Sequence, residues 1–292
     1  MKKITVGGVP EHYNYPWKLT TRNEEFKDLF DEVVWKDYPS GTGAMCQDLR
    51  ASELDVAIIL TEGVTRDILN GNDSRILQVY VDSPLIWGVH TGSQNNFEKP
   101  FTLEGKKIAI SRFNSGSHLM SYVYADQMGW TLTEDDFVVV NDLQGAVDSL
   151  QKGETHYFLW EKFTTKPRVD SGELKMIDEC PTPWPCFVIV VKNEVYNKYK
   201  VEIDLMIKRV KEKAEKVYQD DDLISNVSKE FGLLQEDVIL WHHNLRWNTE
   251  NTPISMDELE KPIQFLRALD MIPDQGKEEM KKQLLGNEKL RI

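Results

Sequence analysis

Asn114, Ser115, Gly116 and Ser117 have the side-chain types and the spacing of a polar receptor at the start of a helix. They follow a β-prone run at residues 107–111 and precede a helical pattern. Backbone N–H groups and the positive end of the helix dipole attract anions at such a junction, and glycine lets a ligand approach the backbone closely. An ordinary serine N-cap, without a ligand, explains the same residues, and it is the commoner explanation when this stretch is considered alone.

A second junction of the same kind lies at residues 40–43, Ser-Gly-Thr-Gly. It joins a strand-like run at residues 33–38 to a helical run at 44–51, which a buried apolar strand at 54–60 follows. A partial repeat links the halves of the chain: Gly43-Ala44 precedes this apolar strand, and Gly145-Ala146 precedes another at residues 156–160. The repeat predicts two similar α/β lobes that face one cleft.

The other candidate residues follow expected strands, because ligands of open α/β sheets bind beyond the carboxyl ends of the strands. For the aromatic loop after the strand at residues 3–6, packing within its own domain remains an equal alternative. The candidate ligand-binding residues are Glu11, His12, Tyr13, Ser40, Thr42, Gly43, Glu62, His90, Arg112, Asn114, Ser115, Gly116, Ser117, His118, Asn141, Trp160, Glu161 and Trp184.

Composition limits the partners. The chain has 292 residues, 40% of them hydrophobic, and a formal net charge of -13. This charge disfavours nucleic acid or an anionic membrane surface as a general partner. The first residues resemble neither a signal peptide nor a membrane helix, so we expect a cytoplasmic monomer, with a periplasmic or extracellular location only if a leader was removed.

The cysteines and histidines do not predict a metal site. Cys46, Cys180 and Cys186 lack a metal-binding spacing, and we expect free thiols, with a disulfide between Cys180 and Cys186 as the alternative. His242 and His243 are adjacent and would point to different sides of a helix. We therefore expect no metal and no cofactor.

The expected elements define two lobes. Lobe 1 comprises residues 1–91 and 183–292, and lobe 2 comprises the inserted residues 92–182. Residues 24–30 read as a helix, residues 84–89 as an extended segment, and residues 90–93 as the polar connection between the lobes. The apolar run at residues 187–191 is typical of a buried strand that returns the chain to lobe 1.

The last hundred residues are expected to be helical. Residues 201–218 carry apolar side chains at helical spacing, and further helices are expected at 223–231, 238–247 and 255–269. The last of these opens on a capping box formed by Ser255 and Glu258, and a charged tail follows from residue 275.

These motifs together resemble the type II periplasmic-binding-protein fold. The matching pieces are Ser-Gly-Thr-Gly-Ala-Met from residue 40, Leu-Glu-Gly-Lys-Lys-Ile-Ala-Ile-Ser-Arg from residue 103, Ser-Gly-Ser-His from residue 115, and Gln-Gly-Ala from residue 144. They are most similar to the sulfonate-binding and thiamine-pyrimidine-precursor-binding (NMT1-like) branch. The resemblance implies two lobes that close over a small ligand, and extra helices at the C-terminal end.

The expected function is binding without turnover. No nucleophile and base with a readable spacing, no Walker loop and no metal set are present in the sequence. We expect a solute-binding, carrier or sensor protein for a small polar metabolite, with a thiamine-related aminopyrimidine ahead of a sulfonate or another anion. A pyrimidine-forming enzyme of the same fold is the alternative, and a membrane transporter would be a partner only if the protein is exported.

Overall fold

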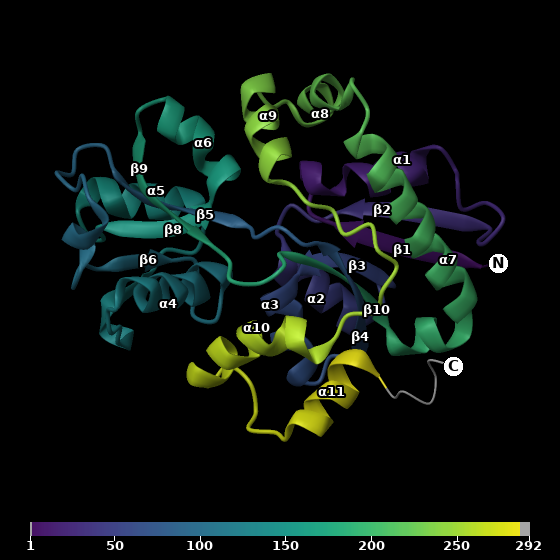
Figure 1. Ribbon diagram of the computed structural model, residues 1–292. Helices are drawn as coiled ribbons and strands as arrows, with labels where there is room; N and C mark the ends of the chain where they lie inside the picture. Colours follow the sequence, from purple (N-terminus) through teal and green to yellow (C-terminus); the bar gives the residue numbers. More distant parts are fainter. Residues whose placement is uncertain (1, 287–292) are drawn as a thin grey trace. The chain divides into compact units, whose positions relative to one another are not determined.

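The computed structural model describes residues 2–286, which form two compact units. Unit 1 comprises Met1–Ser83 and Trp184–Ile292, and unit 2 comprises Pro84–Pro183 (Figure 1). The boundary expected after residue 91 falls instead inside a strand, because residues 90–92 continue an extended segment that pairs on both sides.

A five-stranded sheet forms the centre of unit 1. Its strand order is β2-β1-β3-β10-β4; β1 is parallel to β2 and β3, and β10 is antiparallel to β3 and β4. The apolar runs of β3 and β10 lie in the middle of the sheet and are almost fully buried, as expected for strands covered on both faces. The strands are β1 (Lys3–Gly8), β2 (Glu32–Asp37), β3 (Val56–Leu60), β4 (Ser74–Val81) and β10 (Phe187–Lys192).

Helices cover this sheet, and one of them corrects a prediction. Residues 24–29 form turns rather than the expected helix, and a helix lies earlier, at α1, where Pro16 occupies a first-turn position that suits proline. The helices are α1 (Tyr15–Arg22), α2 (Thr42–Ala51), α3 (Thr61–Leu69), α7 (Asn193–Tyr218), α8 (Leu223–Phe231), α9 (Gln235–Asn244), α10 (Met256–Ala268) and α11 (Lys277–Leu285), with a short 3-10 turn η1 (His12–Asn14).

The C-terminal helices largely agree with the sequence. The capping box of Ser255 and Glu258 at α10 is confirmed. The long helix α7 begins earlier than expected and carries a kink at Tyr199. Residues 275–286 of the expected charged tail include α11, and residues 287–292 lie outside the described part of the chain.

Unit 2 contains a second five-stranded sheet, with the order β7-β6-β8-β5-β9. Strand β6 is parallel to β7 and β8, and β5 is antiparallel to β8 and β9. Helix α6 was not expected from the sequence. The elements are β5 (Ile86–Gly92), β6 (Ile108–Ile110), α4 (Gly116–Met128), β7 (Phe137–Val139), α5 (Leu143–Lys152), β8 (Tyr157–Glu161), α6 (Lys162–Asp170) and β9 (Leu174–Pro181), with 3-10 turns η2 (Pro100–Leu103) and η3 (Glu134–Asp136).

The two sheets have corresponding topologies. Strands β2, β1, β3, β10 and β4 take the places in unit 1 that β7, β6, β8, β5 and β9 take in unit 2. Helices α2 and α5, which carry the Gly-Ala pairs of the sequence repeat, each lead into the third strand of this order. In both units the three parallel strands therefore end at the same edge of their sheet, where the fourth strand begins.

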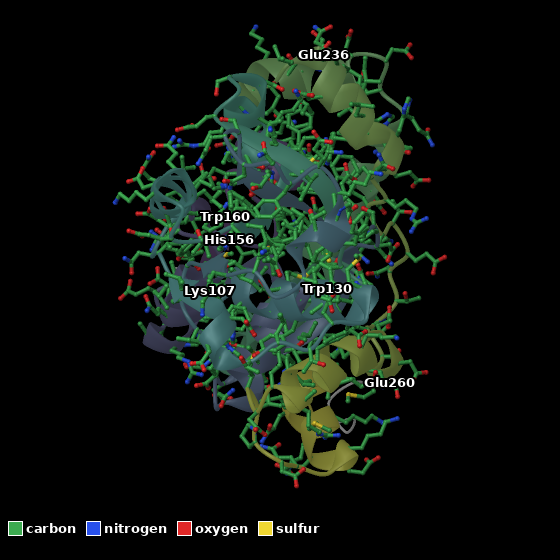
Figure 2. All side chains as sticks on the ribbon, turned by 90° about the vertical axis from the view of Figure 1, so that its left-hand side faces the viewer. Lys107, Trp130, His156, Trp160, Glu236 and Glu260 are labelled. Atoms are coloured by element: carbon green, nitrogen blue, oxygen red, sulfur yellow. The ribbon has the colours of Figure 1, made fainter. Side chains whose placement is uncertain are left out.

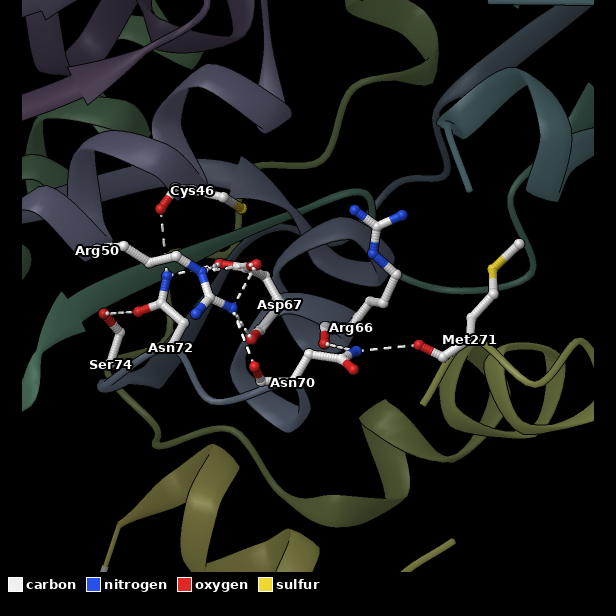
Figure 3. Close-up of polar contacts among 8 residues, drawn as sticks. All are labelled: Cys46, Arg50, Arg66, Asp67, Asn70, Asn72, Ser74 and Met271. Carbon is white, nitrogen blue, oxygen red and sulfur yellow. Dashed lines mark hydrogen bonds and ion pairs between the residues drawn. The ribbon is translucent and has the colours of Figure 1, made fainter. Parts of the chain in front are cut away.

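A polar network fastens α2, α3 and the C-terminal segment together (Figure 3). Arg50 Nη2 donates to Asp67 Oδ1 at 2.8 Å, and Asn72 Nδ2 donates to Asp67 Oδ2 at 2.6 Å. Asn70 Nδ2 donates to the carbonyl oxygen of Met271 at 3.0 Å. Asp67 therefore accepts from α2 and from the loop that follows α3, and the backbone of the chain after α10 is held to the end of α3.

All three cysteines are buried and free. Burial raises the pKa of the Cys46 and Cys180 thiols to about 12, so neither is a thiolate near neutral pH. Across residues 2–286, no helix is both long enough and apolar enough to cross a bilayer.

Candidate functional site

Three serine hydroxyls gather where β6 passes into α4. We call Ser111, Ser115 and Ser117 the serine cluster. Ser117 Oγ accepts from the Ser111 backbone N–H at 3.0 Å and lies 3.0 Å from Ser115 Oγ and 3.3 Å from Ser111 Oγ. Ser115 is the N-cap residue and accepts from the His118 N–H at 3.3 Å. All three serines are buried, so their hydroxyl protons can be redirected toward a ligand without competition from bulk water.

The first amides of α4 lie beside this cluster. The N–H groups of Gly116 and Ser117 belong to the first helical turn, where no preceding carbonyl can accept from them within the helix. The positive end of the dipole of this 13-residue helix is at the same place. Hydroxyls, amides and helix dipole together favour an anionic oxygen group at this edge.

Trp87 covers the start of α4, a contact that was not predicted from the sequence. A Cβ built on Gly116 would lie 2.8 Å from Cη2 of Trp87, so only glycine fits beneath the indole. Trp87 is 7% exposed, and within the described chain its Nε1 has no hydrogen-bond partner. The contact arises because β5 is antiparallel to β8 and starts at the edge where the parallel strands end, which local spacing does not reveal.

His118 is part of this edge but does not supply positive charge. Its Nδ1 accepts from the Asn114 N–H at 3.2 Å, which requires an unprotonated nitrogen. Its ring is enclosed by Phe113, Tyr122 and Phe137. Burial lowers the pKa of His118 to about 4, so the imidazole is neutral near pH 7.

A second loop joins the same edge. The Asn141 N–H donates to the Ser111 carbonyl at 3.0 Å, which brings the end of β7 next to the serine cluster. Asn141 and Asn114 both have positive φ, of 70° and 62°, a conformation that asparagine tolerates well. The side chains of Arg112, Asn114 and Asn141 are exposed, and Arg112 is the charged candidate of this edge.

The remaining candidates of unit 2 serve α6 and its packing. His90 is fully buried within β5, and its Nε2 lies 2.8 Å from Thr165 Oγ1 of α6. Trp160, labelled in Figure 2, packs with Phe158 against the core that α5 and α6 cover. Glu161 is the N-cap of α6 and accepts from Phe163 N and Thr164 N at 3.1 and 2.7 Å. The Glu161 carboxylate is thus already hydrogen-bonded to the first amides of α6.

The corresponding edge of unit 1 carries a buried carboxyl group. Glu62 lies in the first turn of α3, is 2% exposed, and accepts from Trp184 Nε1 at 2.9 Å. Burial raises the pKa of Glu62 to about 7, against the smaller opposing effects of its hydrogen bonds and of Arg66. Burial raises the pKa of the Cys186 thiol, and the charges of Glu62 and Glu11 raise it further, so both carboxyl groups lie near this thiol.

The start of α2 completes this edge. Its N-cap is Gly41, at φ 70°, and no side chain caps the helix. A Cβ built on Gly63 would lie 2.5 Å from Cγ2 of Thr42, so the first turns of α2 and α3 touch. The Thr42 side chain thus lies against Gly63, the residue after Glu62, whereas Ser40 is exposed beyond the helix start.

His12 and Tyr13 lie beneath α9, and the Tyr13 ring is 5.2 Å from that of Phe187 at the start of β10. Their rings are 4.4 and 5.8 Å from the ring of Trp241, and both residues are buried. Burial lowers the pKa of His12 to about 3. Their surroundings are those expected if the aromatic loop packs within its own domain, because α9 covers the loop that follows β1.

The described residues contain no group of three or more histidine, cysteine, aspartate or glutamate side chains placed to hold a metal ion. What the two edges offer is hydrogen bonding. The edge of unit 2 presents hydroxyls and amides, and the edge of unit 1 presents a carboxyl group with a pKa near neutrality.

Two α/β units built on five-stranded sheets of corresponding strand order, with extra C-terminal helices, are the architecture of the type II periplasmic binding proteins, and the chain has this fold. The resemblance expected from the sequence is confirmed at this level. The model of the Ca3427-like family of periplasmic binding proteins matches residues 87–180.

The Candida albicans CA3427 gene product, described as defining a new family with the generic periplasmic-binding-protein fold, is 27% identical, with a TM-score of 0.86 over 98% of this chain and 96% of that one. The aliphatic sulphonate-binding protein SsuA of Escherichia coli is 14% identical, with a TM-score of 0.75 over 98% of each chain. PhnD1 of Prochlorococcus marinus, in complex with methylphosphonate, is 13% identical, with a TM-score of 0.58 over 93% and 99%. No curated protein sequence matches significantly.

Proposed function

We propose that the protein binds a small organic molecule through an anionic oxygen group, such as a sulfonate, phosphonate or carboxylate, and does so without converting it. The observation that carries this proposal is the serine cluster at the start of α4. Ser117 is 3% exposed, and its Oγ lies within hydrogen-bond distance of three polar groups and beside first-turn amides that have no acceptor within the helix. A solute-binding, carrier or sensor protein needs such a site.

Proteins of the same fold support this ligand class. SsuA of Escherichia coli is named for aliphatic sulphonates, and PhnD1 of Prochlorococcus marinus holds methylphosphonate. Both ligand types combine a tetrahedral anion with a small apolar group. Closure of the two units over the ligand, a monomeric state and a membrane transporter as partner stay predictions.

The buried carboxyl group of Glu62 favours a second candidate, a ligand that also carries an amine or an aminopyrimidine. With a pKa of about 7, Glu62 is ionised in about half of the molecules near neutral pH. It can accept a hydrogen bond from an amine when ionised and donate one to a ring nitrogen when protonated. A thiamine-related pyrimidine therefore remains the specific alternative, and the pyrimidine-forming enzyme remains its catalytic counterpart.

The test is calorimetric titration of wild type and Ser117→Ala with ethanesulfonate, methylphosphonate and the aminopyrimidine of thiamine. Loss of one buried hydroxyl contact should weaken the anions by about tenfold. Ser149→Ala is the matched control. Ser149 lies on α5 of unit 2 and is also buried, and its Oγ accepts a hydrogen bond from Thr155 Oγ1 at 2.9 Å. Equal affinities for wild type and Ser117→Ala would contradict the anion site.

A parallel experiment separates binding from turnover. Protein purified under native conditions is denatured, and the released small molecules are identified by mass spectrometry. An unchanged metabolite with an anionic oxygen group supports the proposal. Conversion of an added metabolite in excess of the protein concentration would show an enzyme instead.

A further inference from the structure

A second cavity lies in unit 1, outside both sheet edges described above. Its volume is about 390 Å³, toward the small end of the range for pockets that hold drug-sized molecules. Three segments line it: the residue after β4, the last turn of α7, and residues 245–250. The residues that give it chemical character are Asp82, Glu215, Tyr218, Arg246, Trp247 and Glu250.

Two aromatic rings form adjoining walls of this cavity. The ring centroids of Tyr218 and Trp247 are 6.4 Å apart, and the ring planes are inclined at 80°. Trp247 Nε1 donates to the carbonyl oxygen of Tyr13 at 2.9 Å, which fixes the indole in place. Tyr218 is 39% exposed, so its ring is accessible to a ligand. The two rings therefore meet edge to face, and the Tyr218 ring also lies 4.4 Å from the ring of His242. The exposed part of the Tyr218 ring is the aromatic surface that an ammonium group can approach.

The charges around the cavity also favour a cation. Asp82, Glu215 and Glu250 contribute three carboxylates to the lining, against one guanidinium from Arg246. The 26-residue helix α7 ends here, with its C-cap at Gln219, so the negative end of its dipole adds to this potential.

One buried cation lies beneath the cavity and has its own partners. Lys211 is 1% exposed, and its Nζ donates to Asn248 Oδ1 at 2.9 Å and to the Glu250 carbonyl at 2.5 Å. These bonds pair the ammonium group with the side-chain amide of Asn248 and the backbone carbonyl of Glu250. Counting Lys211 and Arg246 against the three carboxylates still leaves a net negative charge.

We propose that this cavity binds a small organic cation that carries an ammonium group, with the ammonium against Tyr218 and Trp247 and its charge balanced by Glu215 and Glu250. The site adjoins the place where the chain leaves unit 1. The Asp82 N–H donates to the Arg246 carbonyl at 2.8 Å, and the Arg246 N–H donates to Ser83 Oγ at 3.2 Å. The ligand would therefore contact the segment that leads to Pro84.

Titration with choline and with its uncharged isostere 3,3-dimethylbutan-1-ol tests the proposal. Calorimetry should detect choline binding, and the indole N–H resonance of Trp247 should shift on its addition. Glu215→Gln and Tyr218→Leu should each weaken choline by roughly fivefold. Glu260→Gln on α10, labelled in Figure 2, is the matched control, because it makes the same change of charge at a residue that does not line the cavity.

Equal binding of the alcohol and choline, or wild-type choline affinity in both Glu215→Gln and Tyr218→Leu, would overturn the proposal, as would no choline binding at all. Both substitutions are at partly or fully exposed positions, and a thermal melt of each variant verifies that it is folded. Ser117→Ala should bind choline as wild type does, so failure here is distinguishable from failure of the anion site.

Discussion

The two units share a strand order and differ in the chemistry of the edge where their parallel strands end. In unit 2 this edge presents hydroxyls and amides, in the serine cluster and the first turn of α4. In unit 1 it presents a buried carboxyl group, Glu62, held by the indole of Trp184. The comparison shows that topology brings loops together, whereas a few residues in these loops decide which ligand group each edge favours.

The difference also depends on the C-terminal helices. The loop after β6 leads to the serine cluster, and the corresponding loop after β1 leads to His12 and Tyr13. In unit 1, α9 covers that loop, with Trp241 against both rings. Unit 1 therefore presents the ends of β2 and β3, where α2 and α3 begin.

The largest effect is expected for Glu62, whose raised pKa should make the stability of the protein depend on pH. Because the folded protein raises the pKa of Glu62 from 4.5 to about 7, it holds the proton more tightly than the unfolded chain does. The wild-type contribution to stability is thus present below about pH 4.5 and is lost as the pH rises to 7. Glu62→Gln removes this titration. We therefore compare the free energy of unfolding of the variant with that of the wild type at each pH. This difference should shift in favour of the variant by about 3 kcal/mol as the pH rises from acid to mildly alkaline values.

Urea denaturation of both proteins across this pH range is the measurement. The buried histidines act in the opposite sense, because burial lowers the pKa of His12, His90 and His118, and their stabilising contribution is lost as the pH falls from 6.5 toward 4. They are present in both proteins and cancel in the difference. A difference that does not change with pH would show that Glu62 titrates normally.

The next largest effect on stability is expected when the hydrogen-bond donor of Glu62 is removed. Trp184→Phe keeps a ring against Phe265, whose centroid is 6.0 Å from that of Trp184, and deletes the N–H that Glu62 accepts. A buried acceptor left without its donor should reduce the free energy of unfolding by about 2 kcal/mol and raise the pKa of Glu62 further.

Trp130→Phe in unit 2 is the control, because Trp130, labelled in Figure 2, is half-buried, packs edge-on against Tyr124 and follows the C-terminal end of α4. A double-mutant cycle of Trp184→Phe with Glu62→Gln should give a coupling energy of about 1 kcal/mol. Additive effects would mean that the indole and the carboxyl group do not depend on each other.

The smallest effect is expected at Glu161. Because its carboxylate caps α6, Glu161→Gln should reduce the free energy of unfolding by about 0.5 kcal/mol and leave the affinity for sulfonate and aminopyrimidine ligands unchanged. Asp142→Asn, at the cap of α5, is the matched substitution. A tenfold loss of ligand affinity in Glu161→Gln alone would return Glu161 to the binding site.

Features that depend only on residues close together in the chain were predicted correctly from the sequence. The N-cap at Ser115 and the capping box at Ser255 depend on residues within one turn, and both lie where the spacing placed them. Helix α1 was missed because the polar-aromatic residues around Pro16 read as a loop, although α7 packs against them. That packing partner lies almost two hundred residues away in the chain.

The candidate site shows the same limit. Ser115, Gly116 and Ser117 could be named from their spacing, whereas Ser111 was not among the candidates. The indole of Trp87 above Gly116 requires knowledge that β5 runs antiparallel to β8. Likewise, nothing near Glu62 in the sequence indicates Trp184, which follows the whole of unit 2. Contacts that depend on the pairing of distant strands could not be read from one sequence.

The position of β10 also sets an order of assembly during synthesis. This strand lies between β3 and β4, yet it is synthesised only after residues 84–183. Until then β4 lacks its neighbour in the sheet, whereas every strand of unit 2 is already present. Because domains fold as units while the chain emerges at about 5–20 residues per second, the unit that the ribosome begins second is the first that can be completed.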